Sequence, residues 1–205
     1  MIEHSKDEVE KIVEPHINDL RECVHEAWGL WRASDHAANL HWKTVMGNAM
    51  CNYFLKVAMH RFYSKSAFVS VETKRPYVGL YVESALYLRF KKSKRNLRTN
   101  NVQTKSAKAF LDKSQPIEAL EGLTRLELVY VPTRDELEVE RIMLVCKDKG
   151  QIAWTIDLLA TAEIEQTIIE MPQQPTPQGS PAERVIKKTK DRDNEHERST
   201  AGKGK

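Results

Sequence analysis

The chain has 205 residues, of which 40% are apolar and 30% charged, and its formal net charge is only +3. This length suits one domain with a substantial core plus a tail, and the chain contains no apolar run of the length that spans a membrane. The polar N-terminus is unlike a signal peptide, and the three cysteines are far apart, so we expect a cytoplasmic protein with free thiols and no membrane partner.

The first part of the chain, residues 1–63, has the apolar spacing of a helical hairpin. Apolar residues recur at helical intervals over residues 7–32, and Pro15 predicts a kink or a break within that stretch. Ser34-Asp35 is a good helix start signal, and a second helical pattern runs from there to Phe62. The short connection between the two patterns predicts an antiparallel pair.

From residue 64 to residue 170 the pattern changes to the two-residue alternation of strands. Thr104 is a candidate N-cap for a short helix over residues 104–112. Strand patterns lie near residues 66–71, 77–82, 86–91, 123–131, 138–146 and 151–158. The sequence therefore predicts an α+β fold, with an N-terminal helical hairpin packed on a mainly antiparallel sheet of five or six strands.

We expect residues 1–170 to form one domain, closed by a short helix over residues 159–170. The remainder, 171–205, is rich in proline, glycine and charged residues and has almost no large aliphatic side chains. Such a composition cannot bury enough apolar surface to offset the entropy of ordering the chain, so it predicts a disordered tail.

The segment between Glu83 and Asp112 contains no acidic residue and eight basic ones. Lysine and arginine neutralise phosphates, whereas asparagine hydrogen-bonds base edges or backbone. Tyr87 shares a predicted strand face with Arg89 and Lys91, and several RNA-binding sheets combine aromatic and basic side chains in this way. The sequence therefore predicts a site for RNA or DNA made of Tyr87, Arg89, Lys91, Lys92, Lys94, Arg95, Arg98, Asn100, Asn101, Lys105 and Lys108.

Two alternatives stay open. The segments on both sides of the basic block are acidic, so acidic and basic elements of one fold could simply face each other. In that case the chain would be a protein-interaction module, such as an antitoxin-like partner, without a nucleic-acid role. The acidic N-terminal helix with Trp28 and Trp31 favours this alternative.

A second alternative is a metal-dependent nuclease. Glu72-Thr73-Lys74 has the Glu-x-Lys pattern of one nuclease class, and Glu83 is the other acidic residue nearby. Outside this pattern, the sequence has no histidine–cysteine metal motif, phosphate-binding loop or serine-nucleophile motif. We therefore predict no catalytic residue, no metal ligand and no cofactor, although the sequence does not decide whether the protein catalyses a reaction.

Several short motifs resemble those of a group of small uncharacterised bacterial proteins. They are Gly-Leu-Tyr-Val at 79–82, Leu-Arg-Phe-Lys-Lys at 88–92, the segment 96–104, Leu-Thr-Arg-Leu at 123–126 and Ala-Trp at 153–154. That group occurs near genes for a helix-turn-helix regulator joined to a zinc metallopeptidase, in toxin–antitoxin or phage-defence loci. The resemblance implies a bacterial or prophage protein with a non-catalytic or toxin-like role in such a module, and it implies no catalytic residues.

Overall fold

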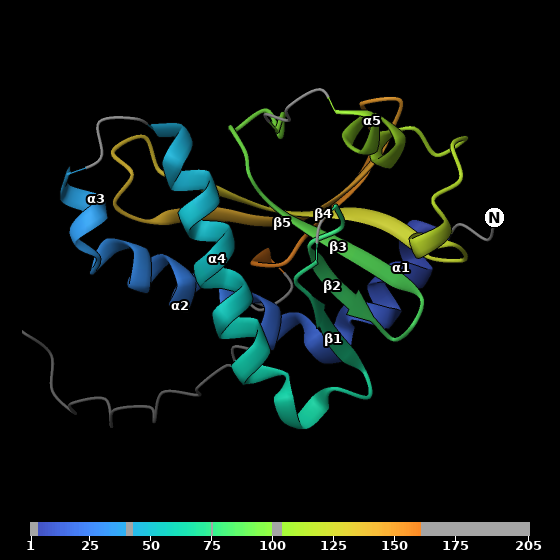
Figure 1. Cartoon of the computed structure of the whole chain (residues 1–205), viewed down its shortest axis with the longest axis horizontal. Helices are drawn as coiled ribbons and strands as arrows, with labels where there is room; N and C mark the ends of the chain where they lie inside the picture. Colours follow the sequence, from blue (N-terminus) through green and yellow to red (C-terminus); the bar gives the residue numbers. More distant parts are fainter. Residues whose placement is uncertain (1–3, 40–42, 75, 100–103, 161–205) are drawn as a thin grey trace, which may run out of the picture. The chain divides into compact units, whose positions relative to one another are not determined.

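Figure 1 shows a computed structural model, which describes residues 4–39, 43–74, 76–99 and 104–160. The chain divides into two units, Met1–Gln166 and Thr167–Lys205, and the second lies outside the described residues. The predicted tail and most of the helix predicted at 159–170 lie outside them as well.

The helical part begins with α1 (Lys6–Val13) and α2 (Ile17–Arg32), which are joined by the short 3-10 segment η1 (Glu14–His16). Ser5 caps α1, because its hydroxyl accepts from the Glu8 amide while the Glu8 carboxylate accepts from the Ser5 amide. Pro15 has no amide hydrogen and lies in the first positions of η1, where no helical hydrogen bond is lost. The kink predicted at Pro15 is therefore confirmed.

The second helical pattern contains α3 (Asp35–Asn39) and α4 (Lys43–Arg61), with residues 40–42 between them outside the described part. The 3-10 segment η2 (Tyr63–Lys65) then leads to the sheet. α2 and α4 pack against each other, and Arg61 on α4 makes ion pairs with Glu22 and Glu26 on α2. The predicted helical hairpin is thus confirmed, and part of the acidity of α2 is neutralised within the fold.

The sheet has six strands in the order of the sequence. They are β1 (Val69–Glu72), β2 (Gly79–Val82), β3 (Leu86–Lys92), β4 (Thr124–Pro132), β5 (Val139–Asp148) and β6 (Gln151–Asp157). All neighbours are antiparallel except β3 and β4, which are parallel. Helix α5 (Lys105–Leu111) lies on the connection between these two strands, because parallel strands need a long crossover.

The two faces of the sheet are covered by different parts of the chain. Strand side chains such as Leu88, Phe90 and Leu128 form one core with residues of α1, α2 and α4. Phe54 of α4 stacks on Phe90 at 4.1 Å between ring centroids, and Phe90 stacks on Tyr130 at 5.1 Å. The opposite face packs against α5 and the turn after β3, so this face is partly buried too (Figure 1).

Trp28 and Trp31 of α2 are both buried in the main core, each with 6% of its surface exposed. Trp28 also donates a hydrogen bond from Nε1 to the carbonyl oxygen of Leu137 at 3.1 Å. These two rings are therefore part of the packing and present little surface to a partner. In the described part of the chain, none of the helices combines the length and apolar character needed to cross a bilayer.

Candidate nucleic-acid interface

Strand β3 distributes the predicted basic residues over both faces of the sheet. Leu86, Leu88 and Phe90 pack into the core under α4, so the residues between them lie on the α5 face. That face carries Arg89 and Lys91, whereas Lys92 lies on the α4 side. Lys92 Nζ is 3.0 Å from Met46 Sδ and 3.0 Å from a carboxylate oxygen of Glu136. Lys92 is thus neutralised and separated from the other two.

After β3 the chain makes a compact turn, residues 93–99, which we call the basic turn. Ser93 and Thr99 form an isolated antiparallel bridge, and the Leu97 amide donates to the Lys94 carbonyl at 2.8 Å. The Ser93 hydroxyl donates toward the carbonyl oxygens of Lys94 and Arg98, at 3.1 and 3.2 Å. The segment therefore has a defined backbone conformation, and Lys94, Arg95 and Arg98 are exposed on it.

Helix α5 carries the remaining basic residues, and both of its ends are fixed. Thr104 is its N-cap, as predicted, because the Thr104 hydroxyl accepts from the Ala107 amide at 3.1 Å. At the other end, Arg125 of β4 donates from Nη1 to the Ala109 carbonyl at 2.7 Å. The guanidinium group thus binds carbonyls that the helix leaves without partners. This docking leaves Lys105 and Lys108 exposed.

The predicted basic residues differ in whether an acidic group already neutralises them. Arg95 lies 3.0 Å from Glu140, and Lys92 is paired with Glu136. In the described part of the chain, no ion pair is made by Lys94, Arg98, Lys105 or Lys108. Acidic and basic elements thus face each other at some positions only, and these four exposed cations keep their charge unpaired within that part.

Arg89 and Lys91 lie deeper than these four. The Arg89 guanidinium is 5.3 Å from the centroid of the Phe110 ring, a cation–π contact with α5. Burial lowers the pKa of Lys91, and the positive charge of Arg89 lowers it further. Both side chains are half-buried, so they lie at the inner edge of the basic surface. Asn100 and Asn101 lie outside the described residues.

Tyr87 does not offer a stacking surface in this structure. Its side chain is fully buried under α5, with edge-on contacts to Tyr81 at 5.1 Å and to Phe110 at 5.9 Å between ring centroids. The predicted exposure of an aromatic and basic sheet face is therefore wrong at Tyr87. The physical reason is that α5 covers this end of the face, which the alternation of β3 alone could not reveal.

A buried polar cluster lies beneath the basic turn and was not anticipated from the sequence. Glu127 of β4 and Lys147 of β5 form an ion pair with 2.6 Å between Nζ and Oε2, and their side chains are 1% and 7% exposed. Thr99 Oγ1 lies 2.9 Å from each of these two atoms. The available signal was that Glu127 stands between Leu126 and Leu128, and that Lys147 directly follows the apolar run 142–146.

The residues of the predicted nuclease motif do not come together. Glu72 pairs with Gly79, whereas Glu83 follows Val82, which pairs with Val69 at the other end of the β1–β2 hairpin. Glu72 Oε1 accepts from the Lys74 amide at 2.7 Å, and Glu83 Oε1 is 2.8 Å from His16 Nε2. Among the described residues, no three His, Cys, Asp or Glu side chains are placed to hold a metal ion.

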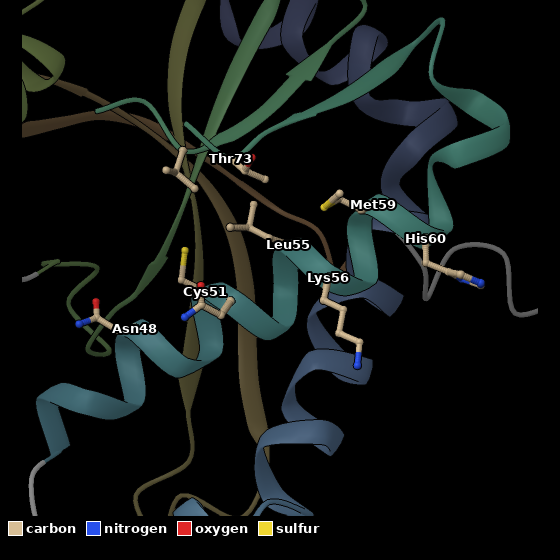
Figure 2. Close-up of a pocket in the computed structure, with 9 residues that line it drawn as sticks. Asn48, Cys51, Leu55, Lys56, Met59, His60 and Thr73 are labelled. Carbon is tan, nitrogen blue, oxygen red and sulfur yellow. The ribbon is translucent and has the colours of Figure 1, made fainter. Parts of the chain in front are cut away.

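A groove of about 830 Å³ runs along α4 beside the connection between β1 and β2 (Figure 2). Cys51, Leu55 and Met59 line it from successive turns of the helix, and Thr73 lies across from them. Lys56 and His60 point away from Thr73 in this view. The groove is thus mainly apolar at its centre and lacks the unpaired cations of the basic turn and α5.

The chain was compared with protein-family models, with curated proteins and with solved structures. No family model, no curated protein and no solved structure matches the chain.

Proposed function

We propose that this protein binds the phosphate backbone of a nucleic acid through a basic face formed by Lys91, Lys94, Arg98, Lys105 and Lys108. The observation that carries the proposal is that only some of the basic residues in this region form ion pairs with acidic residues. Lys92 and Arg95 have acidic partners, whereas the four exposed residues of this face have none in the described part of the chain. A cluster of exposed, unpaired cations attracts a polyanion and repels other cations.

The side chains of the basic face suit contacts with the phosphate backbone of a nucleic acid better than recognition of its bases. Exposed lysine and arginine side chains neutralise phosphates, and such contacts carry no direct sequence information. Tyr87, the aromatic residue predicted to stack on a base, is buried. We therefore expect an affinity that depends little on sequence and strongly on salt, because each neutralised phosphate releases counterions.

The biological setting we propose is a bacterial or prophage regulatory or defence module, in which this chain is a non-catalytic or toxin-like component. The support is the resemblance of residues 79–82, 88–92 and 96–104 to proteins from such loci. Nuclease activity has little support, because Glu72 and Glu83 lie at opposite ends of a hairpin.

The alternative of a protein-interaction module has less support than the sequence suggested. Trp28 and Trp31 are core residues, and Glu22 and Glu26 already pair with Arg61. An acidic protein could still recognise the basic face by the same charges. The test must therefore separate a nucleic acid from an acidic polypeptide.

The experiment measures binding of the full chain to fluorescently labelled single-stranded and duplex oligonucleotides over a range of salt concentrations. The test variant replaces Lys94, Arg98, Lys105 and Lys108 by glutamine. The matched control replaces Lys6, Lys11, Lys56 and Lys74 by glutamine, which are also exposed but lie elsewhere, so both variants have the same reduced net charge.

We expect the parent and the control to bind and the test variant to bind weakly. The logarithmic salt slope of the test variant should be smaller by about 0.9 for each duplex phosphate that it no longer neutralises. Equally weak binding by both variants would mean that only the net charge of the protein matters. It would refute the proposal that the nucleic acid binds at the basic face. Displacement of the oligonucleotide by poly-glutamate at the same charge concentration would favour an acidic protein partner instead.

A further inference from the structure

The basic turn is fixed to the sheet at its C-terminal end by a buried polar cluster. Thr99 Oγ1 donates to Glu127 Oε2 at 2.9 Å and accepts from Lys147 Nζ at 2.9 Å. Glu127 and Lys147 are themselves paired at 2.6 Å and are almost wholly buried. Hydrogen bonds to charged groups in a buried setting are stronger and more directional than those made in water. The position of Thr99 is therefore tightly specified.

A second contact fixes the turn two residues earlier. Leu97 is 8% exposed and packs with Val129, Val131, Met143 and Val145 of β4 and β5. Its backbone has a φ of +56°, a conformation that is unfavourable for a residue with a Cβ atom. A strained backbone conformation of this kind persists only where the surrounding structure holds it in place. Here the packing of the buried Leu97 side chain holds it.

Arg98 lies between these two inward-facing residues. Because Leu97 and Thr99 are both anchored toward the sheet, Arg98 is exposed on the opposite side of the turn. Its amide donates to Asn96 Oδ1 at 3.1 Å, and its carbonyl accepts from the Ser93 hydroxyl at 3.2 Å. The backbone of Arg98 is therefore fixed before any ligand arrives.

We propose that Thr99 is a positioning residue: through its hydrogen bonds to the Glu127–Lys147 pair it holds Lys94 and Arg98 in the geometry that binds phosphate. This inference rests on the proposed function. A preorganised turn gives up less conformational freedom when a ligand binds, so its affinity is higher without any additional interaction. Thr99 itself does not need to touch the ligand.

The test compares the parent, Thr99→Val and Thr99→Ser in the oligonucleotide binding assay. Valine keeps the shape of threonine and removes the hydroxyl, whereas serine restores the hydroxyl. Thr155→Val on β6 is the matched control: Thr155 pairs with Val145, beside the apolar residues on which Leu97 packs, but within the described part of the chain its side chain makes no hydrogen bond. We expect Thr99→Val to weaken binding by about tenfold, and Thr99→Ser and Thr155→Val to bind as the parent does.

The salt dependence distinguishes positioning from the removal of a phosphate-binding charge. Thr99→Val keeps every cation, so its logarithmic salt plot should run parallel to that of the parent, displaced to lower affinity. Arg98→Gln removes a cation that neutralises a phosphate, so its plot should be less steep. If the parent binds the oligonucleotide and Thr99→Val binds it equally well, the positioning role of Thr99 is refuted and the proposed function is not. If the parent itself does not bind, the proposed function is refuted.

Amide hydrogen exchange of the free parent protein provides a second measurement that needs no variant. A preformed turn predicts slow exchange of the Leu97 amide, which donates to the Lys94 carbonyl at 2.8 Å. Fast exchange in the free protein and slow exchange only in the complex would show that the ligand orders the turn, and would overturn the inference even if Thr99→Val did not fold.

Discussion

The ring of Tyr87 fills the space that a side chain at Gly79 would occupy. A Cβ atom placed on Gly79 would lie 2.8 Å from Tyr87 Oη and 2.3 Å from the carbonyl oxygen of Leu88 on the neighbouring strand. Tyr87 cannot move away, because it is fully buried against Phe110 of α5. The close approach of β2 to β3 therefore requires glycine at this position, for reasons of space.

We expect Gly79→Ala to lower the free energy of unfolding by at least about 3 kcal/mol, since backbone and a packed ring must both shift. Gly47 in α4 is the matched control, because a Cβ atom there meets nothing within 4 Å. Gly47→Ala should be neutral or stabilise by up to about 1 kcal/mol through helix propensity. Urea denaturation of both variants measures the difference, and similar values for the two would contradict the packing of Tyr87 on Gly79.

Single and double substitutions of the Glu127–Lys147 pair should have different effects on stability. Lys147→Met leaves the Glu127 carboxylate buried at 1% exposure without its cation, which should cost roughly 3–5 kcal/mol. Glu127→Leu combined with Lys147→Met removes both charges, and the stability of this double variant should return to within about 1 kcal/mol of the parent. Thermal denaturation tests this, and a double variant as unstable as the single one would show that the ion pair itself stabilises the sheet.

The turn between β2 and β3 offers a stabilising substitution. Glu83 and Ser84 both have a φ of +51°, and the Ala85 amide donates to the Val82 carbonyl at 3.0 Å. Positive φ at both central residues is typical of a type I′ hairpin turn, which favours glycine. We expect Ser84→Gly to raise the free energy of unfolding by about 0.5–1 kcal/mol.

Ala85→Gly is the control for that turn, because Ala85 is not among the residues with positive φ. Glycine at Ala85 adds freedom to the unfolded chain and removes a methyl group that is partly buried against the core, so stability should fall by about 1 kcal/mol. A stabilising Ala85→Gly, or a destabilising Ser84→Gly, would contradict the turn geometry described above.

Alkaline pH should destabilise the fold through Cys23. Burial raises the pKa of this thiol from its ordinary value of 9.0 to about 12. Between these two values the unfolded chain has lost the proton while the folded protein keeps it, so stability falls as pH rises, by up to about 1.4 kcal/mol per pH unit. Unfolding free energies measured above and below pH 9 test this, and Cys23→Ala should show a shallower slope.

Burial also raises the pKa values of Tyr87 and Tyr130 above that of a free tyrosine. These two phenols should therefore ionise only as the fold opens. Absorbance at the tyrosinate band, followed together with circular dichroism during an alkaline titration, tests this. Ionisation of Tyr87 and Tyr130 while the protein stays folded would contradict their burial.

Much of the fold could be predicted because local signals agree with the final packing. The kink at Pro15 and the N-cap at Thr104 each depend on a few neighbouring residues, and both appear in the structure. The period-two pattern also placed the six strands within a few residues of their ends. The parallel pairing of β3 with β4 was not specified, because it depends on where the α5 crossover returns the chain.

The candidate site was predicted less completely, because local patterns do not show which face of a strand stays open. Alternation put Tyr87 on the same face as Arg89 and Lys91, but it could not show that α5 covers Tyr87. Likewise, the alternating pattern of β4 does not show that Glu127 is buried. It is buried because the basic turn folds over it and supplies Thr99 as a partner.

Composition and short-range periodicity predict the helices, the strands and the concentration of basic residues between Glu83 and Asp112. Which of those charges remain unpaired depends on the tertiary structure. Lys92 and Arg95 meet Glu136 and Glu140, which lie more than forty positions away in the chain. Whether a cation is neutralised depends on distances of a few ångströms between residues far apart in sequence, and folding alone sets those distances.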